Sequence, residues 1–140
     1  MRHVVSEAGM QDRVVLDSAG TGSWHVGSAP DERATAAASA RGVELTGQAR
    51  QVRPEDFEEF DLILAMDRAN LRDLRALAGS RQAEEKVRLL REFDPAHEGA
   101  EDLDVPDPYY GPGDGFEEVF DLVDAACRGL LDEIRAERVP

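Results

Sequence analysis

One continuous apolar run, from Leu62 to Met66, constrains the fold more than any other stretch of the sequence. It lacks the alternation of apolar and polar residues that marks a half-exposed strand, so it is typical of a parallel strand covered on both faces. Asp67 follows as a helix N-cap, which is a commoner role for such a residue than catalysis. The apolar face of the helix behind it consists of Leu71, Leu74, Leu77 and Ala78. A strand that runs directly into an amphipathic helix predicts an α/β fold.

Further apolar runs and helix stop signals extend this pattern along the chain. Two shorter strands are predicted near Val14–Asp17 and Lys86–Leu90. Helices are predicted over residues 1–9, 30–41, 54–57, 67–78 and 115–136. The order of these elements predicts a three-layer sandwich in which helices flank a mostly parallel sheet. A chain of 140 residues fits a single domain, residues 1–140, that is large enough to bury a core.

Composition restricts the partners and the compartment. The formal net charge of −14 argues against nucleic acid and anionic membranes as partners, because their phosphates would be repelled. No apolar run approaches the roughly 18–20 residues of a membrane span. The first residues lack the apolar core of a signal peptide, so we expect a cytoplasmic location. The only cysteine, Cys127, cannot form an internal disulfide.

Neither a cofactor nor a metal ion is expected. Gly20 and Gly22 begin a pattern like a dinucleotide-binding fingerprint, but the third glycine of that pattern would fall at His25. The acidic segment 93–102 contains His97, yet its carboxylates lack any fixed ligand spacing. We interpret this segment as a solvated loop.

Asp107 is the strongest candidate for a catalytic group because of the turn in which it lies. Prolines flank it on both sides, and each fixes its own φ and restricts the residue before it. Tyr109 and Tyr110 follow, so the turn suits a general acid beside a pocket for a flat ring. Asp104 adds a negative charge that would raise the pKa of Asp107. On turn chemistry alone, an ordinary proline-rich surface turn is the commoner structure.

Motifs spread over nearly the whole chain place this turn in a wider pattern. They are Asp17–Thr21 with Trp24–Gly27 and Pro30–Asp31, Leu62–Asp67 with Asn70–Leu71, and Val105–Gly111 with Phe116–Val119. In this order and spacing they resemble the low-molecular-weight protein-tyrosine-phosphatase family. The resemblance runs from about Val4 to about Leu131.

The resemblance implies hydrolysis of a phosphate monoester, with a phosphotyrosine protein or a small aryl phosphate as substrate. In this family a cysteine thiolate attacks phosphorus, and a loop arginine and backbone amides hold the oxygens. Asp107 would protonate the leaving phenolate, and Trp24, Tyr109 and Tyr110 would line the substrate cleft. No metal is needed. The tyrosine pair favours phosphotyrosine over phosphoarginine, and arsenate reductases on this fold use extra cysteines that this chain lacks.

One part of that chemistry has no counterpart among the 140 residues. Family members open with a short apolar strand, central in a four-stranded sheet, and a phosphate loop of pattern Cys-x5-Arg. Cys127 is followed six residues later by Glu133, and we interpret it as a core residue. We therefore expect an N-terminally truncated phosphatase that is inactive as given. The alternative is a non-catalytic binding or regulatory module of the same fold.

Overall fold

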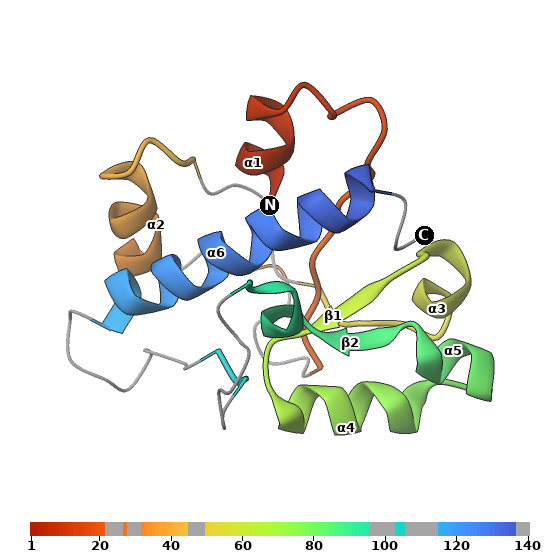
Figure 1. Cartoon of the computed structure of the whole chain (residues 1–140). Coiled ribbons are helices and arrows are strands. Elements are labelled where there is room, and N and C mark those ends of the chain that lie inside the picture. The colour runs from red at the N-terminus through yellow and green to blue at the C-terminus, as the bar shows by residue number, and fades with distance from the viewer. Residues whose placement is uncertain (22–26, 28–31, 45–49, 96–102, 106–114, 137–140) are drawn as a thin grey trace.

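The computed structural model describes residues 1–21, 27, 32–44, 50–95, 103–105 and 115–136. Its elements follow in the order α1 (Arg2–Glu7), α2 (Glu32–Ser39), α3 (Asp56–Glu59), β1 (Ile63–Ala65), α4 (Arg68–Leu77), α5 (Arg81–Glu85), β2 (Val87–Leu89), the 3-10 helix η1 (Leu90–Phe93) and α6 (Gly115–Arg135) (Figure 1). All five predicted helices are present. The short helices α5 and η1 were not predicted. None of the helices in these ranges has both the length and the apolar character needed to cross a membrane.

The sheet consists of β1 and β2, which pair in parallel with Ile63 opposite Val87. Each strand lies one residue inside its predicted limits at both ends. Successive side chains of β1 point to opposite faces, as strand geometry requires. Leu64 packs against the apolar cluster of α1, η1 and α6, whereas Ala65 is buried in the cluster beneath α4. The strand is therefore covered on both faces, as its unbroken apolar sequence predicted.

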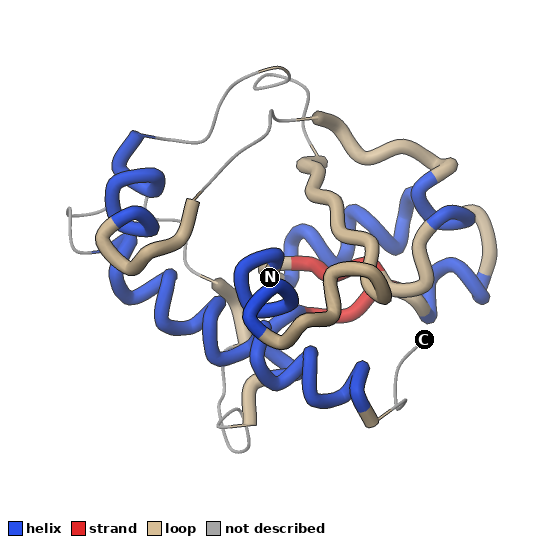
Figure 2. The backbone as a smooth tube through the Cα atoms, turned by 90° about the horizontal axis from the view of Figure 1, so that it is seen from above, coloured by secondary structure: helices blue, strands red, loops and turns tan. Residues whose placement is uncertain are grey.

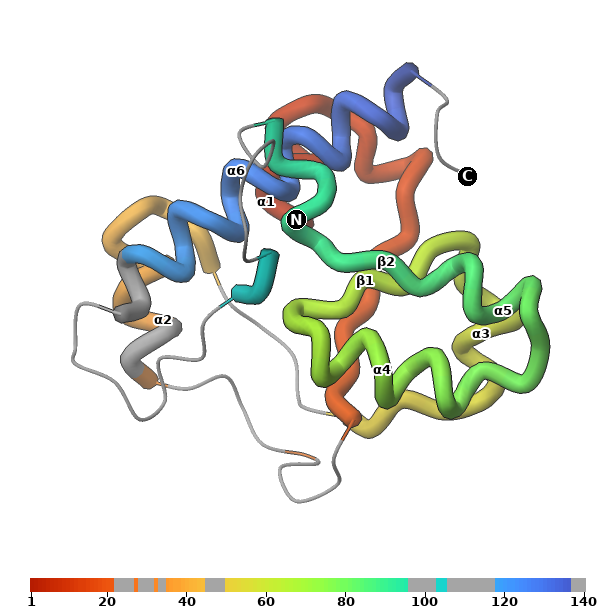
Figure 3. The backbone as a smooth tube through the Cα atoms, turned by 60° about the horizontal axis from the view of Figure 1, so that its bottom comes forward, coloured from red at the N-terminus to blue at the C-terminus, as the bar shows by residue number. Residues whose placement is uncertain are grey.

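Helices form a layer on each side of these strands. α6 and α1 lie on one face, and α4 and α5 lie on the other (Figures 1 and 3). Seen from above, the two strands lie among the helices, near the middle of the described chain (Figure 2). This arrangement is the predicted α/β sandwich, with a parallel sheet flanked by helices.

The long helix α6 packs most closely on η1. A Cβ atom added at Gly129 would overlap the carbonyl oxygen of Phe93, so only glycine permits this approach of the two backbones. Cys127 is 4% exposed and lies in the same cluster, which confirms its interpretation as a core residue.

The strand predicted near Val14–Asp17 is wrong. Val14 and Leu16 are half-buried against the α6 cluster, and Val15 is 86% exposed, so the alternation of a strand is present. However, no backbone hydrogen bond joins this stretch to another segment of the described chain. A strand needs a neighbouring backbone as well as an apolar pattern. Among the described residues of this part of the chain, parallel pairing begins at the isolated bridge between Gly20 and Gln51.

Candidate active site

The four predicted site residues, Asp107, Trp24, Tyr109 and Tyr110, lie outside the described residues. These residues fall in two segments, 22–26 and 106–114, and the chain just before each of them is described, at residues 17–21 and 103–105. We call these two described segments, 17–21 and 103–105, with the residues that hold them in place, the frame of the candidate site. Both parts of this frame are held by specific hydrogen bonds.

The first part holds residues 103–105 at the carboxyl end of β1. The backbone N–H of Val105 donates to the carbonyl oxygen of Met66, with a distance of 2.7 Å between nitrogen and oxygen. Met66 directly follows the last residue of β1. In open α/β sheets, ligands bind outside the carboxyl ends of the strands. Val105, two residues before Asp107 in the sequence, thus lies at the edge where this kind of fold places its sites.

Asp104 and Arg91 fix the same segment from two further directions. The backbone N–H of Arg68, the first residue of α4, donates to Asp104 Oδ1 at 2.8 Å. Arg91 is half-buried, and its Nη1 donates to the carbonyl oxygen of Asp104 at 2.7 Å. Sequence reasoning missed the role of Arg91, because its partner lies 13 residues away in an irregular segment. No spacing rule pairs two such residues.

Asp67 has the capping role that the sequence predicted. Its Oδ1 accepts a hydrogen bond of 2.7 Å from the backbone N–H of Asn70. The N-terminus of α4 therefore receives one carboxylate from Asp67 and a second from Asp104. A helix N-terminus carries a partial positive charge that favours anions. The two carboxylates offset the partial positive charge of this helix end, and the Arg91 guanidinium, bonded to the Asp104 carbonyl oxygen, adds one positive charge beside them.

The second part of the frame ties the segment 17–21 to the segment 50–52. Gly20 N–H donates to the Arg50 carbonyl oxygen, and Val52 N–H donates to the Gly20 carbonyl oxygen, both at 2.9 Å. The amide nitrogen of Gln51 donates to the Thr21 carbonyl oxygen at 3.2 Å. These bonds fix the chain three residues before Trp24.

Arg50 strengthens this tie with its side chain. Its guanidinium lies 3.1 Å from Asp17 Oδ2 and 2.9 Å from Asp56 Oδ2, and Asp56 is buried. The Ser18 backbone N–H and Arg50 lower the pKa of the Asp17 carboxyl. Burial acts to raise the pKa of Asp56, but hydrogen bonds from Arg50 and the Arg53 backbone outweigh it, so the net pKa is lowered. Both carboxylates are therefore held ionised.

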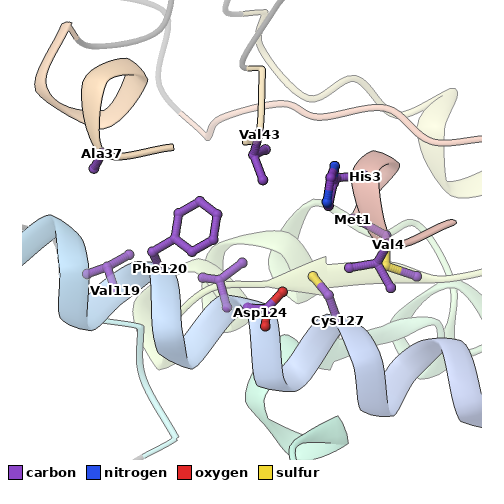
Figure 4. Close-up of a pocket in the computed structure, with 10 residues that line it drawn as sticks. Met1, His3, Val4, Ala37, Val43, Val119, Phe120, Asp124 and Cys127 are labelled. Carbon is purple, nitrogen blue, oxygen red and sulfur yellow. The ribbon is translucent and has the colours of Figure 1, made fainter. Parts of the chain in front are cut away.

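A separate cavity of about 240 Å³ lies over α6, between α1 and α2 (Figure 4). Its wall is largely apolar and includes Val119, Phe120 and Val123 of α6. Cys127 also borders this cavity, and burial raises the pKa of its thiol. A cysteine nucleophile needs the opposite shift, which an electropositive and accessible position provides. This cavity is therefore not the catalytic site. The described residues also contain no cluster of side chains that could hold a metal ion.

Comparison with known proteins identifies the family. The model of the low molecular weight phosphotyrosine protein phosphatases matches residues 1–139. A low molecular weight protein-tyrosine-phosphatase of Streptomyces coelicolor is 48% identical over 133 residues, which are 95% of this chain and 80% of that protein.

Solved structures agree with the sequence comparison. A protein tyrosine phosphatase from Entamoeba histolytica, with Hepes in its active site, superposes with a TM-score of 0.91 at 30% identity, covering 99% of this chain and 86% of the other. The drosophila arginine phosphatase DARP gives a TM-score of 0.84 at 29% identity, covering 95% and 84%. The fold, the frame at the carboxyl end of β1 and these matches together show that the chain belongs to the low molecular weight phosphotyrosine protein phosphatase family.

Proposed function

We propose that this chain contributes the general acid, Asp107, to the hydrolysis of phosphate monoesters. The substrates are phosphotyrosine proteins or small aryl phosphates. One structural observation carries the proposal: Val105 N–H is bonded to Met66 O at the carboxyl end of β1, two residues before Asp107. The names of the similar proteins support the reaction class. They do not favour the alternative of a non-catalytic module.

The proposed chemistry assigns one proton to Asp107 in each of two steps. A cysteine thiolate forms a bond to phosphorus while the bond from phosphorus to the aryl oxygen breaks. Protonated Asp107 gives its proton to the departing phenolate oxygen. The resulting carboxylate then takes a proton from the water molecule that attacks the phosphocysteine, which releases phosphate and restores both groups.

The thiolate has no source among these 140 residues, because Cys127 is buried and the position required for the arginine is Glu133. We therefore propose that the chain as given does not turn over aryl phosphates. A fusion in which the strand and Cys-x5-Arg loop of a family member precede Met1 would supply the absent groups.

Steady-state assays of the chain and of this fusion test the proposal. The chain should be inactive, and the fusion should hydrolyse aryl phosphates. In the fusion, Asp107→Asn should lower kcat by roughly 10²–10⁴-fold for phenols that leave poorly, and by less as the phenol becomes more acidic. An equal loss for all leaving groups would contradict the assignment of Asp107. Turnover by the chain alone that disappears in Asp107→Ala would reveal a different nucleophile.

Trp24, Tyr109 and Tyr110 are proposed to line the cleft and contact the ring of the substrate. The tyrosine pair supports a preference for phosphotyrosine, although the fold itself is shared with an arginine phosphatase. Assays of the fusion with phosphotyrosine and phosphoarginine decide this point. A higher kcat/KM with phosphoarginine would contradict the proposal.

A further inference from the structure

Three hydrogen bonds from three different elements converge on two consecutive residues, Asp104 and Val105. Met66, at the end of β1, accepts from the Val105 backbone N–H. Arg68, at the start of α4, donates its backbone N–H to the Asp104 carboxylate. Arg91, in η1, donates from its side chain to the Asp104 carbonyl oxygen. Each bond restrains a different atom, so both the position and the direction of this segment are fixed.

Helix capping alone does not account for Asp104. α4 already has a local cap in Asp67, which bonds to Asn70 N–H. Asp104 reaches the same helix end from 36 residues further along the chain. A second carboxylate adds less stability to a helix that is already capped. The bond from Arg68 N–H to Asp104 instead joins the segment 103–105 to the unit that β1 and α4 form. The described contacts therefore make Asp104 an anchor for the chain that follows it.

The sequence that follows can transmit this anchoring to Asp107. Only Val105 and Pro106 lie between the anchor and Asp107, and Pro108 comes directly after it. Both prolines restrict the backbone of the residue before them as well as their own. Few torsions are thus left free between the fixed Val105 amide and the carboxyl group that is proposed to move a proton.

We propose that Asp104, supported by Arg91, is a positioning residue that sets where Asp107 stands relative to the carboxyl end of β1. The inference rests on the proposed function of Asp107. The charge of Asp104 was also predicted to raise the pKa of Asp107, and the geometric role proposed here is separate from that prediction. Proton transfer needs heavy atoms within hydrogen-bond reach, so a displaced anchor lowers kcat.

Amide hydrogen exchange tests the anchor on the chain itself, without any activity. Asp104→Ala should speed exchange of the Val105 amide by about tenfold or more, because the segment loses one of its three restraints. Asp104→Asn should have a smaller effect, since its amide oxygen can still accept from Arg68 N–H. Ser80→Ala is the matched control, because Ser80 caps α5 through Ala83 N–H at 3.1 Å. Equal Val105 exchange in Asp104→Ala and Ser80→Ala would overturn the proposal.

Kinetics of the fusion with the Cys-x5-Arg loop test the consequence for catalysis. Asp104→Ala should lower kcat about 10–100-fold with a poor leaving group, while kcat with a good leaving group and KM stay nearly unchanged. Asp104→Asn should recover part of the loss, and Ser80→Ala should show none. Loss that does not depend on the leaving group would overturn the positioning role. If the loss of kcat in Asp107→Asn does not depend on the leaving group, the proposed function fails, and the positioning role fails with it. The exchange rate of the Val105 amide tests the anchor independently of that result.

Discussion

Arg50 shows how one residue can join segments that the sequence keeps far apart. Its guanidinium bridges Asp17 and the buried Asp56, and its carbonyl oxygen accepts from Gly20 N–H. Replacing Arg50 with Met would leave the Asp56 carboxylate buried without its main charged partner. We expect a loss of about 1–3 kcal/mol in the free energy of unfolding at neutral pH. Urea denaturation measures it, and an unchanged midpoint would show that the bridge contributes nothing.

The same bridge predicts a pH dependence of stability. The folded-state pKa values of Asp17 and Asp56 lie below their ordinary value of 3.8, so the unfolded chain binds protons more readily in acid. The contribution of the bridge is complete above that ordinary value and is lost as the pH falls through the lowered values. In Arg50→Met this acid-induced loss should be smaller. Urea denaturation between pH 2 and pH 6 compares the two proteins, and parallel pH profiles would contradict the mechanism.

Tyr110 is expected to act on substrate affinity, because a ring contact holds the substrate equally in the ground state and the transition state. In the fusion with the Cys-x5-Arg loop, Tyr110→Ala should raise KM several-fold for aryl phosphates and much less for alkyl phosphates. Tyr110→Phe serves as the control, since it keeps the ring. A similar change in KM for both substrate classes would mean that the tyrosine is structural.

At the scale of elements, local signals predicted most of what the structure shows. The strand β1, the Asp67 cap and α6 depend on neighbours within a few residues, and all three are present. The helix α5 was not predicted, although Ser80 is a typical N-cap residue and its side chain accepts from Ala83 N–H.

The frame of the candidate site was much less predictable. The Asp104–Arg68 contact joins residues 36 positions apart and the Arg50–Asp17 contact joins residues 33 apart, so both depend on tertiary packing and not on local spacing. The strand expected near Val14–Asp17 failed for a related reason. Its side-chain pattern is local, but its hydrogen-bond partner is not. The proline-rich turn already made Asp107 a candidate, and the family resemblance added its role as general acid and the roles of Trp24, Tyr109 and Tyr110. These residues lie outside the described residues, so their roles stay predictions.

The whole molecule is a small sheet between well-packed helices. Within the described residues the sheet has two strands of three residues each, and β1 has a strand partner on one edge only. Sheets of two short strands are marginal in water, and three or more strands, or packing against a helix, are needed for stability. The helices α4 and α6 provide that packing here. The burial pattern of a strand is nevertheless present at Val14, Val15 and Leu16. Within the described residues, no backbone hydrogen bond pairs this stretch with a neighbouring strand.

We therefore expect the fusion with a family strand and Cys-x5-Arg loop to be markedly more stable than the chain alone. A strand that pairs with the open edge of β1 gains backbone hydrogen bonds and buries about four apolar side chains, each worth ~1.5–3 kcal/mol. Strain and ordering offset part of this, so a net gain of about 5 kcal/mol is expected against a typical domain stability of ~5–15 kcal/mol. Urea denaturation of both proteins measures the difference. The control is a fusion with two Asp residues in place of apolar residues of the added strand, which should lose most of the gain. A cooperative transition of the chain within ~1–2 kcal/mol of the fusion would show that the two-stranded sheet and its helices suffice.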